Sequence, residues 1–473
     1  MSKQPPLHVV ILAAGKGRRM RSAIPKVLHQ VAGKSLLGHV LDTALALEPT
    51  KVHVVVGHEK QSVIEHFKDH PQTDLINWVE QAEQLGTGHA VSQAIPSIGS
   101  EIENGAHVLM LTGDVPLIQS TTLENLCAQM RSHPLAVLTA FVDDPFGLGR
   151  MVRDDSNAIT GIVEQKDASP EIQAIKEINS GILCAHGEQL KLWLSQIDKQ
   201  NAQGEYYLTD IVALAYQSGN PIATIQANDN IEITGINSRS QLAQAERAYQ
   251  TQQAERLMDA GVTIIDPARI DIRGDVQIGQ DTIIDVNVVI QGPTTIGTNV
   301  SIAPNCVITQ SSLGDNVAVH PNTVIENSIL GKAVNVGPFA RLRPGTELSE
   351  GVKIGNFVET KNAQLAAGSK VNHLSYVGDA TVGSNTNIGA GVITCNYDGA
   401  NKHKTVIGED VFVGSDCQLI APVTIADGAT IGAGSTISND VDAKQLAISR
   451  SKQRQIDNWQ RPSKTNKKPA NNK

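Results

Sequence analysis

The second half of the sequence places an aliphatic residue at every sixth position, and this feature restricts the fold more than any other. The spacing is unbroken over Ile278, Ile284, Ile290, Ile296, Ile302 and Ile308, and it returns in Val336, Leu342, Leu348 and Ile354 and in Val413, Leu419, Ile425, Ile431 and Ile437. A period of six suits a triangular coil, in which each flat side is one short strand with a turn and three hexapeptides complete one rung. The pattern therefore predicts a left-handed parallel β-helix over residues 261–455 and disfavours a generic β-sandwich.

Other features of this half fit the same coil. Small residues follow several of the aliphatic positions, and glycine's conformational freedom suits tight corners; they include Gly279, Gly297, Gly355, Gly383, Gly389, Gly414 and Gly432. The stretch 396–402 reads Asn-Tyr-Asp-Gly-Ala-Asn-Lys, which is too polar for the coil wall, so we expect a projecting loop there. Residues 456–473 are rich in Lys, Arg, Pro, Asn and Ser, which predicts a flexible basic tail.

The first half follows a different pattern. Short aliphatic strands, expected at residues 9–12, 52–56 and 108–111, alternate with longer mixed segments that are typical of helices. We therefore expect an α/β, Rossmann-like, doubly wound domain over residues 1–238. A linker helix is expected over residues 239–260, where one apolar stripe would comprise Leu242, Ala245, Tyr249, Leu257 and Met258.

Length, charge and cysteine content limit the classes of protein. A chain of 473 residues exceeds the size of a single core. A net charge of -9 leaves no basic surplus to neutralise a nucleic-acid backbone, and no run approaches the ~18 apolar residues of a spanning helix. The five cysteines are dispersed and form no C-x-x-C pair, so buried free thiols are expected. We expect a cytoplasmic protein with small-molecule substrates, without a nucleic-acid partner or membrane insertion.

The first predicted strand runs into a glycine-rich turn. The turn reads Leu12-Ala13-Ala14-Gly15-Lys16-Gly17-Arg18-Arg19-Met20, and Pro25-Lys26 follows. Small residues let backbone amides approach a phosphate or a base edge, and Arg18 and Lys26 supply the positive charge that a triphosphate requires. The turn matches neither the P-loop nor the dinucleotide fingerprint, so its meaning depends on the rest of the domain.

The pattern L-A-A-G-x-G followed by P-K-x-L resembles the nucleotide-sugar pyrophosphorylase family, which transfers a nucleotidyl group from a nucleoside triphosphate to a sugar 1-phosphate. Asp114 also follows an aliphatic strand directly, where ligands of α/β proteins bind. The resemblance implies catalytic roles for Arg18 and Lys26 and a Mg²⁺ site at Asp114 and Asn237. It implies nucleotide or sugar contacts by Leu12, Ala13, Ala14, Gly15, Thr112 and Gly113, by Gln81, Gly86 and Thr87 near uracil, and by Gly149, Glu164 and Asn179 near the sugar. The sequence departs from the family twice, because Arg18 replaces a usual Thr and Thr112 a usual aromatic residue.

The coil carries motifs of its own. His373 lies where the hexapeptide phase is irregular, and imidazole has a pKa suited to removing a proton from an amine near neutrality. Segments 339–345, 356–361 and 391–402 are similar to those of the bacterial bifunctional glucosamine-1-phosphate acetyltransferases and N-acetylglucosamine-1-phosphate uridyltransferases. This resemblance covers about residues 7–460.

The second resemblance implies that His373 deprotonates the amino group of glucosamine 1-phosphate for attack on acetyl-CoA. It implies that Arg343 and Lys361 hold the sugar phosphate, that Tyr376 and Asn387 position the sugar, and that Asn396 and Tyr397 line the acetyl-CoA side. The implied coenzyme A contacts are Ala390, Ser415, Ala433 and Arg450. It also implies a homotrimer with acetyl sites between subunits.

The preferred interpretation is two consecutive steps on one chain: acetylation of glucosamine 1-phosphate, then uridylyl transfer from UTP that yields UDP-N-acetylglucosamine, a cell-wall precursor, and pyrophosphate. One alternative is a single-activity sugar-1-phosphate nucleotidyltransferase whose β-helix is only a scaffold, and the coil motifs argue against it. A non-enzymatic binding module is disfavoured because the charged residues of the nucleotide site are all present.

Overall fold

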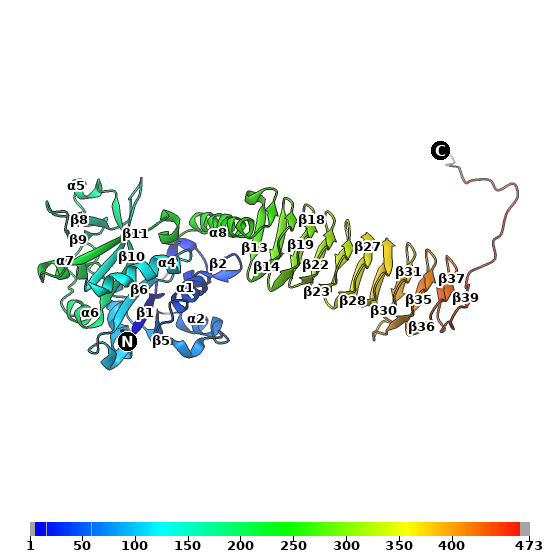
Figure 1. The fold of residues 1–473 in the computed structure, drawn as a ribbon, viewed down its shortest axis with the longest axis horizontal. Helices are drawn as coiled ribbons and strands as arrows, with labels where there is room; N and C mark the ends of the chain where they lie inside the picture. Colours follow the sequence, from blue (N-terminus) through cyan, green and yellow to red (C-terminus); the bar gives the residue numbers. More distant parts are fainter. Residues whose placement is uncertain (1–4, 16, 58, 464–473) are drawn as a thin grey trace, which may run out of the picture. The chain divides into compact units, whose positions relative to one another are not determined.

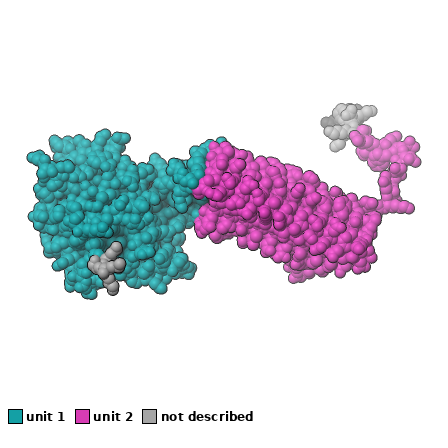
Figure 2. All heavy atoms as spheres, in the orientation of Figure 1, with its two compact units in different colours: residues 1–259, 266–274 teal, residues 260–265, 275–473 magenta. Residues whose placement is uncertain are grey.

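The computed structural model describes residues 5–15, 17–57 and 59–463, apart from the side chain of Arg18. The chain divides into two compact units, one of residues 1–259 with 266–274 and the other of residues 260–265 with 275–473 (Figure 2). The α/β class and the parallel β-helix of hexapeptide repeats are both confirmed.

The first unit is built on a nine-stranded mixed sheet (Figure 1), whose main path runs β11-β7-β10-β6-β1-β4-β5. Its strands are β1 (Leu7–Leu12), β4 (Lys51–Val56), β5 (Ile76–Glu80), β6 (His107–Thr112), β7 (Leu135–Phe141), β8 (Arg150–Arg153), β9 (Ile159–Val163), β10 (Glu177–His186) and β11 (Ile222–Gln226). β1 pairs in parallel with both β4 and β6, so the chain crosses over in both directions from β1 and creates a switch point at its carboxyl end. β10 runs antiparallel to β6 and β7, so the winding is not parallel throughout.

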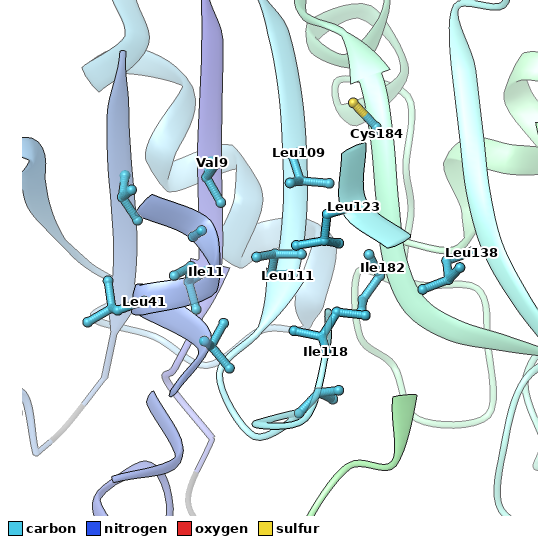
Figure 3. Packing of buried hydrophobic residues seen from close by; sticks show 14 of the residues in the cluster. Val9, Ile11, Leu41, Leu109, Leu111, Ile118, Leu123, Leu138, Ile182 and Cys184 are labelled. Carbon is cyan, nitrogen blue, oxygen red and sulfur yellow. The ribbon is translucent and has the colours of Figure 1, made fainter. Parts of the chain in front are cut away.

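Helices pack on both faces of this sheet through two hydrophobic clusters. Alternation along β1 sends Val9 and Ile11 into one cluster and Val10 into the other. Figure 3 shows the first cluster, which also contains Leu41 of α1 and Leu123 of α4. The helices are α1 (Leu36–Leu45), α2 (Lys60–His66), α3 (Thr87–Ile98), α4 (Ser120–Ala128), α5 (Pro170–Gln173), α6 (Gly187–Leu194), α7 (Asp210–Gln217) and α8 (Arg239–Asp259), and a short hairpin comprises β2 (Gln30–Val31) and β3 (Lys34–Ser35).

The stripe expected on α8 is only partly correct. Met258 is exposed, and Gln250 is buried instead, at 1% exposure. The Gln250 amide donates to the carbonyl oxygen of Ile272 at 2.9 Å and accepts from the Ile272 amide at 2.7 Å. The helix therefore meets the backbone of β13 (Ile270–Arg273), whose polar groups select a polar partner.

The second unit repeats one rung many times. In the first ladder of strands Ile284 pairs with Ile302, and Ile302 pairs in turn with Val319. Three hexapeptides account for the first step, and the second rung is one residue shorter. A longer step joins Ile388 to Val413, because the polar segment predicted to project lies between them.

This first ladder comprises β12 (Thr263–Ile264), β15 (Ile283–Ile284), β18 (Ser301–Ile302), β21 (Ala318–Val319), β24 (Asn335–Val336), β27 (Lys353–Asn356), β29 (Lys370–His373), β31 (Asn387–Ile388), β34 (Phe412–Val413), β37 (Thr430–Ile431) and β39 (Leu446–Ala447). The other strands of the unit are β14 (Val276–Ile278), β16 (Val288–Gln291), β17 (Thr294–Ile296), β19 (Val307–Thr309), β20 (Ser312–Leu313), β22 (Val324–Glu326), β23 (Ser328–Leu330), β25 (Arg341–Leu342), β26 (Thr346–Leu348), β28 (Glu359–Leu365), β30 (Tyr376–Val382), β32 (Ile393–Cys395), β33 (Thr405–Ile407), β35 (Gln418–Ile420), β36 (Val423–Ile425) and β38 (Thr436–Ile437).

The glycines that follow the aliphatic positions serve a different purpose from the one expected. A Cβ on Gly279 would lie 2.7 Å from the carbonyl carbon of Gly297 in the next rung, so close stacking of backbones excludes a side chain there. Many left-handed corners are occupied by asparagine, which tolerates positive φ; they include Asn287, Asn299, Asn305, Asn316 and Asn322.

Three further expectations concern the cysteines, membrane-spanning helices and the C-terminal tail. All five cysteines are free thiols, of which Cys184, Cys306 and Cys417 are buried and Cys127 and Cys395 are partly buried. Among the described residues, no helix combines the length and the apolar character needed to cross a lipid bilayer. Residues 456–463 are exposed and form no helix or strand, and the rest of the predicted tail, 464–473, lies outside the described residues.

Candidate active sites

The carboxyl ends of β1, β4, β5 and β6 bring the predicted nucleotide residues to one edge of the sheet. Leu12 pairs with Thr112 in the register of β1 and β6, and the Gly113 amide donates to the Leu12 carbonyl oxygen at 2.9 Å. On the other side of β1, the Gln81 amide donates to the Val56 carbonyl oxygen at 2.8 Å. The glycine-rich turn and the residues before Asp114 therefore lie side by side, as expected.

A cavity of about 280 Å³ lies beside the glycine-rich turn. It is lined by Ala13, Ala14, Gly15, Pro25, Lys26, Val27, Gly57, Glu59, Val63 and Gln84. The Gln84 side-chain amide donates to the Ala14 carbonyl oxygen and so fixes the turn. Gln84 was not among the predicted site residues, although it belongs to the segment of Gln81 and Gly86 that the family pattern singled out.

Lys26 joins the two predicted metal ligands. Its Nζ donates to Asp114 Oδ2 and, at 2.9 Å, to Asn237 Oδ1. The Ile236 amide donates to the Asp114 carbonyl oxygen at 2.9 Å, which holds the two distant segments together. The carboxylate and the amide oxygen thus converge on one cation, and this pair of oxygen donors suits Mg²⁺.

The predicted base contacts form a compact group. Gln81 is 4% exposed, and its Nε2 lies 3.1 Å from the Gly86 carbonyl oxygen and 3.0 Å from His89 Nδ1. Gly86 has φ of 121°, and a Cβ there would lie 2.4 Å from the Tyr206 carbonyl oxygen. Thr87 Oγ1 accepts the Leu208 amide at 2.9 Å. His89 was missed by the sequence analysis, because its spacing from Gln81 gave no signal.

The three predicted sugar contacts also meet. The Asn179 amide donates to the Gly149 carbonyl oxygen at 2.9 Å, and a Cβ on Gly149 would lie 3.2 Å from Glu164 Oε1. Burial raises the pKa of Glu164, and the hydroxyl of Thr209, which donates to it at 3.3 Å, opposes this effect. Arg18 lies in a 3-10 turn, Arg18–Met20, and its predicted side-chain role falls outside the described residues.

A second, larger cavity of about 920 Å³ lies at the opposite edge of the sheet, near the amino ends of β1 and β6. It is lined in part by His107, Arg131 and His186, and none of the predicted site residues lines it.

In the coil, cations gather around the predicted phosphate site. Arg343 Nη1 donates to Glu359 Oε1 at 2.8 Å. The neighbouring Lys402 and, to a smaller degree, Arg343 lower the pKa of Lys361. Such crowding of like charges favours an anion between them. Glu359 and Lys402 were not predicted, but Glu359 pairs with Tyr376 in the next rung, so the regular spacing of rungs could have identified it.

His373 is held by a neighbour one rung away. Asn356 and His373 pair across β27 and β29, and Asn356 Oδ1 lies 3.0 Å from His373 Nδ1. With this oxygen as the acceptor, Nδ1 carries the proton and Nε2 keeps a lone pair for a substrate. The regular spacing of one rung could have identified Asn356 from the sequence.

The remaining predicted contacts fall into two groups. Asn396 Nδ2 donates to Asp379 Oδ2, and the exposed Tyr397 donates its hydroxyl to the Gly399 carbonyl oxygen at 2.6 Å. Tyr376 pairs with Glu359, whereas Asn387 belongs to the ladder of His373. A separate column in later rungs comprises Ala390, Ser415, Ala433 and Arg450, and the Arg450 guanidinium donates to the Ala433 carbonyl oxygen at 2.7 Å. The described contacts place His373 on one ladder and Lys361 and Tyr376 on another, and Arg343 directly follows a strand of the latter, β25.

An α/β unit in which a carboxylate and an amide oxygen converge on one lysine, together with a hexapeptide coil that carries a cluster of cations, defines a two-domain sugar-nucleotide transferase. Residues 9–194 match the MobA-like NTP transferase domain, residues 272–350 the GMPPB C-terminal domain, and residues 404–439 the bacterial transferase hexapeptide repeats. The chain is similar to proteins named bifunctional protein GlmU: 54% identical to that of Marinobacter nauticus, 53% to that of Stutzerimonas stutzeri and 51% to that of Pseudomonas putida. These matches cover 97–98% of this chain and 99% of each relative.

The chain belongs to the bifunctional GlmU family. It is an enzyme with two transferase activities, acetylation of glucosamine 1-phosphate and uridylyl transfer to N-acetylglucosamine 1-phosphate, which together make UDP-N-acetylglucosamine.

Proposed function

We propose that uridylyl transfer takes place at the carboxyl edge of the sheet in the first unit, with Mg²⁺ held by Asp114 and Asn237. The observation that carries this proposal is the convergence of both oxygens on the ammonium of Lys26. Gln81, Gly86 and Thr87 bind uracil. Gly149, Glu164 and Asn179 bind the sugar, and the turn from Leu12 to Gly15, with Thr112 and Gly113, binds the nucleotide.

In this step an oxygen of the sugar 1-phosphate bonds to the α-phosphorus of UTP. The bond from that phosphorus to the bridging oxygen breaks, and pyrophosphate leaves. The attacking oxygen is already ionised, so no general base is needed. Bound Mg²⁺ would offset the negative charge of the phosphate oxygens. Lys26, freed from its two partners, and Arg18 offset the charge that develops on the departing pyrophosphate.

Acetyl transfer takes place on the coil, with acetyl-CoA as donor. Arg343 and Lys361 bind the phosphate of glucosamine 1-phosphate, and Tyr376 and Asn387 position its ring. The amino nitrogen of glucosamine 1-phosphate bonds to the thioester carbonyl carbon, and Nε2 of His373 accepts a proton from that amino group. The carbon–sulfur bond then breaks, which releases coenzyme A. Asn396 and Tyr397 line the acetyl-CoA side, and the column of Ala390, Ser415, Ala433 and Arg450 binds coenzyme A.

A homotrimer completes the acetyl sites. Phe339, Phe357 and Leu374 occupy successive rungs of one corner, each with positive φ and with 51%, 56% and 66% exposure. The two phenylalanine rings stack with centroids 5.4 Å apart. Large apolar side chains in a left-handed conformation are strained and uncovered there, which favours burial against another copy. This corner adjoins His373, so the covering subunit would lie beside the proposed base.

The proposed co-substrates, UTP and acetyl-CoA, are metabolites of the cytoplasm, so we place both reactions in that compartment. The domains we propose are 1–238 for uridylyl transfer, 239–260 as a linker helix, 261–455 for acetyl transfer and 456–473 as a tail.

The test separates the two activities. Thiol release from acetyl-CoA is measured with glucosamine 1-phosphate, and pyrophosphate release with UTP, N-acetylglucosamine 1-phosphate and Mg²⁺. We expect His373→Ala to abolish thiol release and spare pyrophosphate release, and Asp114→Ala to do the reverse. His320→Ala changes a histidine elsewhere in the coil and serves as the matched control. The residue assignments would be refuted if His373→Ala kept thiol release and Asp114→Ala kept pyrophosphate release.

A further inference from the structure

Arg150, the first residue of β8, is a buried cation to which the proposed reaction gives no role. It is 1% exposed. Its guanidinium donates to neutral acceptors: Nη1 to the Leu148 carbonyl oxygen, and Nη2 to Gln165 Oε1 at 2.8 Å and to the Gln173 carbonyl oxygen at 3.4 Å. Burying a charge costs free energy that neutral acceptors recover only in part. A guanidinium retained at such a cost points to a function.

The register of three strands explains where this charge lies. Arg150 is opposite Val163 on β9 and opposite Ile178 on β10. Each of these three positions neighbours a proposed sugar contact in the sequence. Gly149 directly precedes Arg150, Glu164 directly follows Val163, and Asn179 directly follows Ile178. The backbone of one residue is therefore next to the backbone of all three sugar contacts.

The acceptors of the guanidinium extend this link to the surrounding loops. Leu148 belongs to the loop before β8, and Gln165 directly follows Glu164. Gln165 Oε1 also accepts the Gly147 amide at 3.0 Å, so Arg150 and Gly147 share one acceptor. Gln173 ends α5, shortly before β10. Loss of the guanidinium would release three segments at once.

The charge of Arg150 also acts on Glu164. Burial raises the pKa of Glu164, Asp167 raises it further, and Arg150 lowers it. Asp210 and Tyr207 also face this carboxyl, and the pKa of each is raised, chiefly by burial and in part by Glu164. Glu164 accepts a hydrogen bond from a sugar hydroxyl best when it is ionised. The nearby positive charge of Arg150 stabilises this ionised form.

We propose that Arg150 is a positioning residue for the sugar 1-phosphate, which holds Gly149, Glu164 and Asn179 in one arrangement and so sets the affinity for the sugar and not for the nucleotide. The inference rests on the proposed function, because it takes these three residues as the sugar contacts.

The experiment compares Arg150→Met and Arg150→Lys with the wild-type enzyme in the uridylyl transfer assay. For Arg150→Met we expect KM for N-acetylglucosamine 1-phosphate to rise at least tenfold, while KM for UTP stays within twofold. The pH at which KM for the sugar phosphate begins to rise on acidification should move upward, because Glu164 loses the cation that lowers its pKa. Arg150→Lys keeps the charge, so its pH profile should stay near that of the wild type.

Further variants keep the outcomes distinct. If Arg150→Met fails to fold, Gln165→Met removes one acceptor and leaves the cation, and it should raise KM for the sugar phosphate about threefold. Equal increases in both KM values, or no change in either, would overturn the role of Arg150. If Glu164→Ala and Asn179→Ala leave KM for the sugar phosphate unchanged, the sugar assignment under the proposed function fails instead, and the inference fails with it.

Discussion

The hydrogen bond between Asn356 and His373 makes a sharp prediction about acetyl transfer. Replacing Asn356 by Leu removes the acceptor that holds the proton on Nδ1. His373 is exposed, so the imidazole is then free to take its other tautomer and orientation. A hydrogen bond of this kind contributes about 0.5–1.5 kcal/mol, which corresponds to a loss of about twofold to thirteenfold in kcat.

The assay is thiol release from acetyl-CoA at saturating glucosamine 1-phosphate, with pyrophosphate release as the second readout. Asn356→Asp keeps an acceptor and adds a negative charge, so the acid limb of its pH profile should move to higher pH. Asn335→Leu is a matched control, because Asn335 Oδ1 makes the same type of contact with His320 Nε2, at 2.8 Å, elsewhere in the coil. A kcat for Asn356→Leu within twofold of the control would refute the orienting role.

Three further predictions follow from described contacts. Burial lowers the pKa of His53 from 6.5 to about 4. The stability that the neutral imidazole contributes is therefore fully present above pH 6.5, and about 3 kcal/mol of unfolding free energy is lost as the pH falls to 4. In urea titrations at these two pH values, His53→Asn should reduce that loss, whereas the control His66→Asn, at an exposed histidine, should not. Gly86→Ala would force a Cβ to within 2.4 Å of the Tyr206 carbonyl oxygen and should raise KM for UTP and lower stability by about 1–3 kcal/mol, measured by kinetics and denaturation. Arg343→Lys keeps the charge but loses the planar fork, so KM for glucosamine 1-phosphate should rise about tenfold while KM for acetyl-CoA is unchanged.

The coil was predictable because its rule is local. An aliphatic residue at every sixth position fixes which side chains point inward, and the observed pairing of Ile284 with Ile302 follows from three such repeats. The reason for the glycines was not predictable in the same way. Position 279 requires glycine because the backbone of the next rung leaves no room for a Cβ atom. The six-residue pattern says which side chains point inward, but it does not say how closely two rungs approach each other.

The nucleotide site needed long-range information. Family motifs identified Lys26, Asp114 and Asn237, but their meeting joins residues 88 and 211 positions apart. Arg150 escaped notice because an arginine in a strand is ordinarily expected at the surface. Its burial and its register with two other strands emerge only when the sheet is assembled.

The nearly constant rung also determines how the second unit acquires its structure in time. Residues that meet in adjacent rungs are close in sequence wherever they lie in the unit, as Asn287 and Asn305 are near its start and Asn356 and His373 further along. The rung that carries the projecting segment is only moderately longer. Because the entropy of loop closure grows only with the logarithm of loop length, closing this longer rung costs only about 0.3 kcal/mol more than closing an ordinary one. Folding can therefore advance rung by rung, with a similar free-energy cost for adding each rung. The projecting segment therefore adds Asn396 and Tyr397, two proposed substrate contacts, to one rung while leaving the cost of folding that rung nearly unchanged.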